Sequence, residues 1–322
     1  MMLNYNVRHI DKTLVLRPPQ KESLERFACL CDILSLDRLG EAKKVFAEGQ
    51  RSIAEPDFFD PASVEAVKHQ RDALVAELTS NYQPICAEDL SKVHAQWPTL
   101  TNFERNFPSV CFALATGIGK TRLMGALIAY LVYEKGYKNF FVMAPNLTIY
   151  KKLKDDLGNP TNPKYVFRGL DRFVNPPRII DGDNYEQFRQ GTLSDANSDI
   201  TINVFNISKL NSESGRMRRL QEVLGQSYFA YLQSLPDLSI FMDESHHYHA
   251  DRGFETINEL HPIGVELTVT PQTQKGSRKV LFENVIYEYP LAQALNDGRY
   301  VKVPTVFTRR DFRPEEYANS PQ

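Results

Sequence analysis

The sequence lacks most of the features that mark a secreted, disulfide-stapled or membrane-spanning protein. Only four cysteines occur in 322 residues, and none forms a CxxC pair, so neither a disulfide framework nor a zinc ribbon is expected. The longest apolar run, 123–132, falls well short of the roughly 18 residues that a bilayer-spanning helix requires. The N-terminus has no signal-peptide pattern. We therefore expect a cytoplasmic protein with no membrane partner.

A strong charge of one sign is also missing. The chain carries 38 Lys and Arg against 40 Asp and Glu, which excludes a histone-like binder but allows a local basic groove on an enzyme. Its 42 % hydrophobic and 24 % charged residues are ordinary for a globular protein, whose length suffices for about two domains.

The first part of the chain predicts a small, mostly helical domain over residues 1–95. Apolar residues recur at helical spacing over 23–36 and again over 63–78, where Ser63 can serve as the N-cap. Pro84 and the Trp-Pro-Thr segment at 97–99 mark the predicted boundary.

From residue 108 the pattern changes to short apolar runs that alternate with amphipathic helices. Runs with so few polar alternations are typical of strands buried on both faces, as in a parallel sheet covered by helices. The pattern therefore predicts an α/β domain with a doubly wound parallel sheet. The predicted strands are 109–115, 139–144, 201–205, 238–242 and 264–270.

The clearest chemical motif is the segment 115–122, ATGIGKTR, which follows a predicted strand and opens a predicted helix. Its glycines let backbone N–H groups turn toward a polyphosphate, and the helix N-terminus adds its positive end. In such a loop Lys120 reaches the β- and γ-phosphates and the Thr121 hydroxyl binds Mg²⁺. Leu114 stands where the strict pattern has glycine. The predicted nucleotide-binding residues are Thr116, Gly117, Ile118, Gly119, Lys120, Thr121 and Arg122.

Acidic residues at the end of another predicted strand complete the chemistry of an ATP hydrolase. Asp243 and Glu244 follow the run 238–242, on the rim where open α/β sheets bind ligands. We expect Asp243 to hold Mg²⁺ and Glu244 to orient and deprotonate the attacking water. We expect His246 to couple these carboxylates to the next motif. ATP and Mg²⁺ are the predicted cofactors.

Thr268 and Thr270 end the last predicted strand, within the segment ELTVTP. Taken alone, β-branched residues in a strand are ordinary. Placed after the acidic motif, their hydroxyls are candidates to hydrogen-bond His246 and to report the state of the nucleotide.

The order of these motifs resembles that of superfamily 2 helicases and translocases. Residues 115–121 correspond to motif I, 141–147 to motif Ia, 243–246 to a DExH motif II and 268–270 to motif III, in which Val269 replaces the usual alanine. The sequence in and around these motifs resembles the restriction (Res) subunit of type III restriction–modification enzymes and related defence helicases over about 108–310. Its matching segments are 144–150, 243–248, 257–260, 266–271 and 289–292.

The resemblance implies a RecA-like first helicase domain over 96–310 and a linker over 311–322. It implies an ATP-dependent translocase or helicase module that acts on double-stranded DNA in a type III restriction or phage-defence system. A modification methyltransferase subunit is the implied partner. Only 52 residues follow Thr270, so we expect a second RecA-like domain with the arginine finger in a longer chain or a partner subunit.

Three questions stay open at this point: the function, the glutamine that reads adenine and the role of the lysines after motif Ia. The chain could instead be an RNA or DNA-repair helicase fragment, or a nucleotide-gated DNA-binding scaffold that does not hydrolyse ATP. Either Gln70 or Gln96 could be the glutamine that reads adenine. The lysines after motif Ia fit phosphate contacts with a nucleic acid and a solvated helix face equally well; they are Lys151, Lys152 and Lys154.

Overall fold

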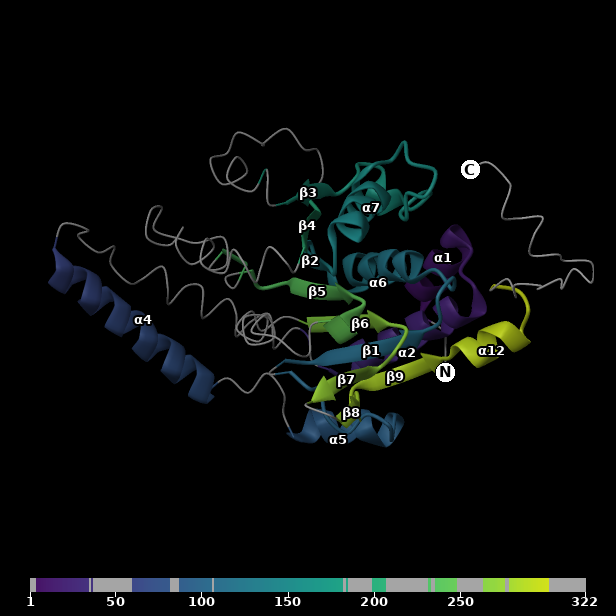
Figure 1. Ribbon diagram of the computed structural model, residues 1–322. Helices are drawn as coiled ribbons and strands as arrows, with labels where there is room; N and C mark the ends of the chain where they lie inside the picture. The colour runs from purple at the N-terminus through teal and green to yellow at the C-terminus, as the bar shows by residue number, and fades with distance from the viewer. Residues whose placement is uncertain are drawn as a thin grey trace, which may run out of the picture.

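A seven-stranded sheet organises the fold, and Figure 1 shows its strands one above another from β3 to β9. The computed structural model describes residues 4–34, 36, 60–81, 87–105, 107–181, 184, 199–206, 231–232, 235–247, 263–275 and 278–300. The predicted linker 311–322 and the matching segment 257–260 lie outside these residues.

Every pair of neighbouring strands in this sheet is parallel, as predicted. In sheet order the strands are β3 (Arg178–Ile180), β4 (Thr201–Asn206), β2 (Asn139–Ala144), β5 (Leu238–Asp243), β6 (Ile263–Thr268), β1 (Ser109–Leu114) and β9 (Val285–Tyr289). All five predicted strands are present. The five interior strands β4, β2, β5, β6 and β1 are buried almost throughout, which explains their largely apolar sequences.

The short strand β3, the edge strand β9 and an antiparallel hairpin were not predicted. The hairpin consists of β7 (Gln272–Lys275) and β8 (Arg278–Leu281), and β8 is exposed along its length. The strands β3, β7 and β8 are short and contain few apolar residues, and Glu288 interrupts the apolar residues of β9. Neither kind of sequence gives a pattern from which a strand can be recognised.

Helices cover one face of the sheet through a single continuous core. The chain passes from β1 to β2 through α6 (Lys120–Lys135) and from β2 to β3 through α7 (Leu147–Gly158). Both passages run in the same direction across the sheet, so right-handed crossovers place both helices on the same face. A second apolar cluster lies on the opposite face, and it includes Phe107, Phe141, Met143, Ile240 and Met242.

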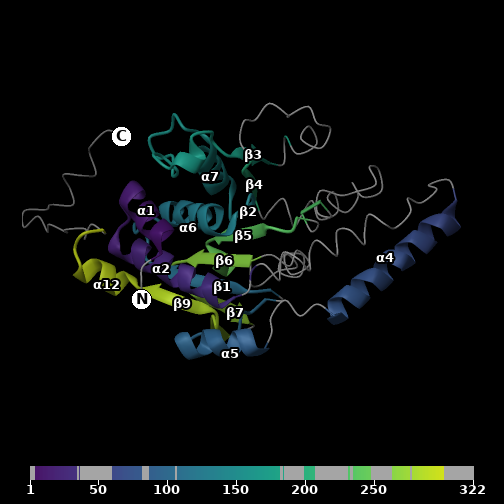
Figure 2. The same ribbon diagram turned by 180° about the vertical axis from the view of Figure 1, so that it is seen from behind.

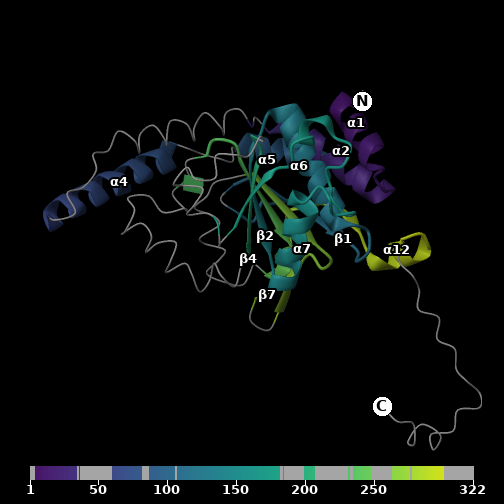
Figure 3. The same ribbon diagram turned by 90° about the horizontal axis from the view of Figure 1, so that it is seen from above.

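The N-terminal helices α1 (Tyr5–Leu14) and α2 (Pro18–Ile33) pack against α6, as Figure 3 shows from above. Arg122 donates from Nη1 to the carbonyl oxygen of Leu14 at 2.7 Å, and the α1 side chain of Asn6 donates to Glu134 at 2.6 Å. Figure 2 shows from behind that α2 also lies near the edge strand β9, which it contacts. The division of the chain at residue 95 stays a prediction, but α1 and α2 share the core of the seven-stranded sheet.

The remaining described helices lie at the borders of the sheet. The helix α5 (Ala87–Gln96) packs on α2, and α12 (Leu291–Asn296) follows β9. In Figures 1 and 2, α4 (Pro61–Asn81) projects away from the strands. Among the described helices, none combines the length and apolar character that crossing a membrane requires.

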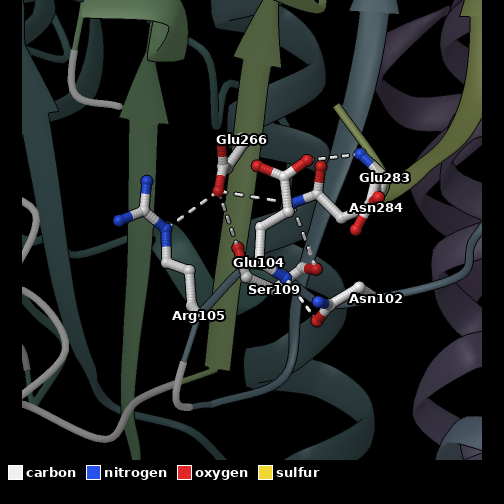
Figure 4. Close-up of polar contacts among 7 residues, drawn as sticks. All are labelled: Asn102, Glu104, Arg105, Ser109, Glu266, Glu283 and Asn284. Atoms are coloured by element: carbon white, nitrogen blue, oxygen red, sulfur yellow. Dashed lines mark hydrogen bonds and ion pairs between the residues drawn. The ribbon is translucent and has the colours of Figure 1, made fainter. Parts of the chain in front are cut away.

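A buried ion pair joins three segments at the end of the sheet where β1 and β6 begin (Figure 4). Nε of Arg105 lies 2.9 Å from Oε1 of Glu266, and both side chains are fully buried. The same oxygen accepts hydrogen bonds from the Ser109 hydroxyl at 3.1 Å and from Nδ2 of Asn284 at 3.3 Å. The carboxylate of a central strand thereby holds the residues that lead into β1 and β9.

We predict that breaking this pair costs far more stability than breaking a surface pair. Arg105→Met and Glu266→Gln should each lower the free energy of unfolding by about 3–5 kcal/mol, because each leaves one buried charge uncompensated. The double variant Arg105→Met/Glu266→Gln should lose less than the sum of the two single changes. Urea denaturation followed by circular dichroism measures these differences.

The matched control is Asp32→Asn, which removes the mostly exposed partner of Lys135, 3.5 Å away. This change should cost about 1 kcal/mol or less. Equal losses from Arg105→Met and Asp32→Asn would contradict the structural role of the buried pair.

Candidate functional site

The loop between β1 and α6 has the backbone of a phosphate cradle. Gly117 and Gly119 have φ angles of 88° and 97°, in the left-handed region that favours glycine. Gly119 is the N-cap of α6, and among the described residues no side chain caps this helix end. The first N–H groups of α6 therefore remain available to an anion.

The start of helix α2 holds this loop from behind. Nε2 of Gln20 donates to the carbonyl oxygens of Ile118 and Gly119, at 2.9 Å each, and Arg17 donates from Nη1 to that of Gly117. Gln20 is 1 % exposed, and its Oε1 accepts from the Arg17 backbone N–H. Because N–H and C=O point in opposite directions across a trans peptide, carbonyls held on the α2 side leave the N–H groups facing the other side.

The sequence did not identify Gln20. The two glutamines it offered are both exposed, Gln70 on α4 and Gln96 at the end of α5. Gln20 precedes the loop by about 100 residues, so no spacing argument reaches it. The local signal was the Arg-Pro-Pro-Gln segment, because prolines at a helix start fix where that helix begins.

The acidic end of β5 meets the loop. Nζ of Lys120 lies 2.9 Å from Oε1 of Glu244. Burial raises the pKa of the neighbouring Asp243 to about 6, and the Glu244 charge adds to the rise while Lys120 and Lys152 oppose it. Glu244 has a φ angle of 52°, which is uncommon for a residue with a side chain.

The two carboxyl-end motifs also meet. Nδ1 of His246 lies 3.0 Å from the Thr268 hydroxyl and 3.7 Å from Oε2 of Glu244. The Thr268 hydroxyl in turn bonds the backbone N–H and carbonyl of Thr270, at 3.2 Å each. The predicted contact between His246 and Thr268 is thus present, whereas Thr270 takes part through its backbone.

The lysines of α7 have different environments. Nζ of Lys152 donates to the Thr121 hydroxyl at 3.0 Å and lies 3.6 Å from Asp156. Lys154 forms an ion pair with Asp181, while Lys151 is exposed. Lys152 therefore belongs to the loop side of the helix, a placement that its sequence position did not reveal.

The residues present fit a magnesium ion. Thr121 and Asp243 offer a hydroxyl and a carboxylate, and oxygen ligands of this kind are those that Mg²⁺ prefers. Asp243 is buried, and among the described residues its Oδ1 has no hydrogen-bond partner. A buried, unpartnered carboxylate oxygen beside a phosphate-type loop is suited to a cation.

A cavity of about 390 Å³ lies beside the start of α2. It is lined by Pro18, Pro19, Glu22, Tyr287, Tyr289, Gln293, Asp297, Arg299 and Tyr300. The Arg17 guanidinium, which holds the loop, lies 5.1 Å from the centre of the Tyr300 ring. Arg17 thus connects the loop to a cavity with aromatic walls.

Comparison with known proteins points to one family. Residues 64–273, more than half of the chain, match the family described as type III restriction enzyme, res subunit. The chain is also similar to the probable type III restriction-modification enzyme HindVIP Res subunit of Haemophilus influenzae, with 31 % identity over 160 residues. That alignment covers 48 % of this chain and 28 % of the relative.

We predict that Gln20→Glu destabilises the protein and that the loss depends on pH. The change keeps the shape of the side chain but places a carboxylate against two carbonyl oxygens, which should cost about 1–3 kcal/mol at neutral pH. This environment raises the pKa of the new carboxyl above its unfolded value of about 4.3, so the loss should grow as the pH rises from 4 to 7. Thermal melts at several pH values measure it.

Gln96→Glu is the control, since Gln96 is exposed at the end of α5. It should leave the melting temperature nearly unchanged at every pH. A pH-independent loss in Gln20→Glu, or the same loss in both variants, would count against the loop-holding role of Gln20.

Proposed function

Because the chain belongs to the type III restriction enzyme Res-subunit family, we propose that it is the ATP-hydrolysing module of a DNA translocase or helicase. The family makes it a superfamily 2 helicase-type module of a restriction system. The proposal that this module hydrolyses ATP rests on the contact between the loop and the end of β5, where Nζ of Lys120 and Oε1 of Glu244 lie 2.9 Å apart. The aligned segment is 28 % of the relative's length, so the activity of the whole protein is part of the proposal.

The loop binds the phosphates of ATP through backbone N–H groups and Lys120. Thr121 and Asp243 hold Mg²⁺, which when bound supplies positive charge to the phosphate oxygens. Lys120 exchanges its partner Glu244 for the β- and γ-phosphates. Its charge therefore serves Glu244 before the nucleotide arrives and the phosphates afterwards.

Glu244 then acts on the attacking water. Released by Lys120, its carboxylate is free to orient the water and accept its proton. Nδ1 of His246, within 4 Å of Glu244 and in contact with Thr268, is placed to relay a change at Glu244 to the end of β6. We propose this path as the coupling between ATP hydrolysis and the rest of the motor.

The base of ATP binds in the cavity beside the start of α2 and the edge strand β9. The cavity next to Arg17 offers tyrosine rings for stacking and polar groups for hydrogen bonds, as nucleotide pockets generally do. Gln20 contributes by shaping the loop, since both atoms of its amide already bond the protein.

The proposed partners follow the family. They are double-stranded DNA, a second RecA-like domain in a longer chain or partner subunit, and a modification methyltransferase subunit. The second domain supplies the arginine finger, which helps to neutralise the charge of the transition state. Arg122, the last residue of the segment 115–122, donates to the Leu14 carbonyl instead.

The first functional prediction separates binding from hydrolysis. Lys120→Ala should abolish or severely weaken Mg·ATP binding in isothermal titration. In a longer chain that includes the second domain, Glu244→Gln should bind ATP at least as tightly as the wild type, because Lys120 loses its competing partner, yet hydrolyse it at least about 100-fold more slowly. Lys135→Ala, at the far end of α6, is the control and should change neither. Wild-type affinity in Lys120→Ala would refute the phosphate-loop assignment.

The second functional prediction concerns the nucleic acid. Residues 1–322 alone should hydrolyse ATP slowly with little stimulation by duplex DNA, because an arginine finger contributes roughly 10³–10⁵ in rate where it has been measured in GTPases. A longer chain with the second domain should respond to duplex DNA. The measurement is a steady-state ATPase assay with duplex DNA, RNA or no effector.

Other results of this ATPase assay would favour one of the alternative functions. Stimulation by RNA but not by DNA favours an RNA helicase, and ATP binding without hydrolysis under any effector favours a nucleotide-gated scaffold. Fast DNA-stimulated hydrolysis by residues 1–322 alone would show that the second domain is not needed.

A further inference from the structure

Helix α7 adds a further positive charge at the loop, beside the Lys120 ammonium and the partial positive charge of the α6 N-terminus. The Lys152 ammonium donates to the hydroxyl of Thr121 at 3.0 Å. Its side chain is half exposed, whereas Asp156, 3.6 Å away, is only 5 % exposed. Lys152 is therefore held between a buried carboxylate of its own helix and the hydroxyl that the loop offers to a metal.

This contact places Lys152 at the metal end of the site. Thr121 is one of the two residues that fit Mg²⁺, so the Lys152 ammonium bonds the hydroxyl oxygen that a metal would use. No other lysine of α7 does this: Lys154 pairs with Asp181, and Lys151 is exposed.

We propose that Lys152 is a positioning residue of the metal site, which holds the Thr121 hydroxyl and gives it up when Mg²⁺ enters with the nucleotide. This inference rests on the proposed function. A metal bound to the Thr121 oxygen at about 2.1 Å would lie within about 5 Å of Nζ where it now stands, so the two cations repel. The flexible lysine chain then carries its charge toward the terminal phosphate.

The inference gives two consequences of opposite sign. Lys152 competes with Mg²⁺ for the site, so removing its charge lets Mg²⁺ bind more readily. Lys152 attracts the phosphates, so removing its charge weakens the binding of a nucleotide without metal. A side chain that merely supported the fold would affect both in the same direction.

The test is a titration of the whole chain with a fluorescent, non-hydrolysable ATP analogue, first in EDTA and then across a range of Mg²⁺ concentrations. In Lys152→Met the Mg²⁺ concentration that gives half-maximal binding should fall on the order of tenfold, the effect expected of one charge at this distance. Affinity in EDTA should fall several-fold. Lys152→Arg keeps the charge and should restore the wild-type Mg²⁺ midpoint.

Lys164→Met is the control, because it removes an exposed lysine from the turn after α7. It should shift neither quantity. Unchanged values in Lys152→Met, or changes of the same sign in both, would overturn the role of Lys152 and leave the proposed function intact. Wild-type protein that shows no Mg²⁺-dependent binding of the analogue would instead overturn the proposed function, and the inference with it.

Discussion

The fold depends on the buried contact between Arg105 and Glu266. Glu266 lies on β6, the strand between β5 and β1, and its carboxylate fixes the segments that enter β1 and β9. Two residues further on, the same strand face presents Thr268 to His246. One face of a single strand therefore joins a structural anchor at one end of the sheet to the reactive groups at the other.

The two lysines of the site have partners within the protein, whereas Oδ1 of Asp243 has no hydrogen-bond partner among the described residues. Lys120 pairs with Glu244, and Lys152 pairs with Thr121 and Asp156. A site that holds several carboxylates and cations this close is stable only when opposite charges alternate. The same arrangement makes the site responsive, because any phosphate or metal that enters must redistribute these pairs.

Much of this could be predicted from the sequence. Five buried strands, the parallel sheet, the helix after the loop and the meeting of His246 with Thr268 all followed from apolar runs and motif order. The role of Gln20 and the contact of Lys152 with the loop could not be found this way. Gln20 contacts carbonyls about 100 residues further along the chain. The contact of Lys152 with Thr121 depends on where a flexible side chain points, which no sequence periodicity encodes. Strand β9 was missed because its apolar residues are interrupted by Glu288.

The close fit of Gly119 against α2 has a consequence for folding during synthesis on the ribosome, because α2 is made before the loop. A Cβ at Gly119 would lie 2.6 Å from Nε2 of Gln20, so loop and helix are shaped against each other. Gln20 leaves the ribosome about 100 residues before its partner carbonyls, which at about 5–20 residues per second is a delay of roughly 5–20 seconds. During synthesis the helix that supports the loop must wait, with its buried face uncovered, until the loop and α6 emerge.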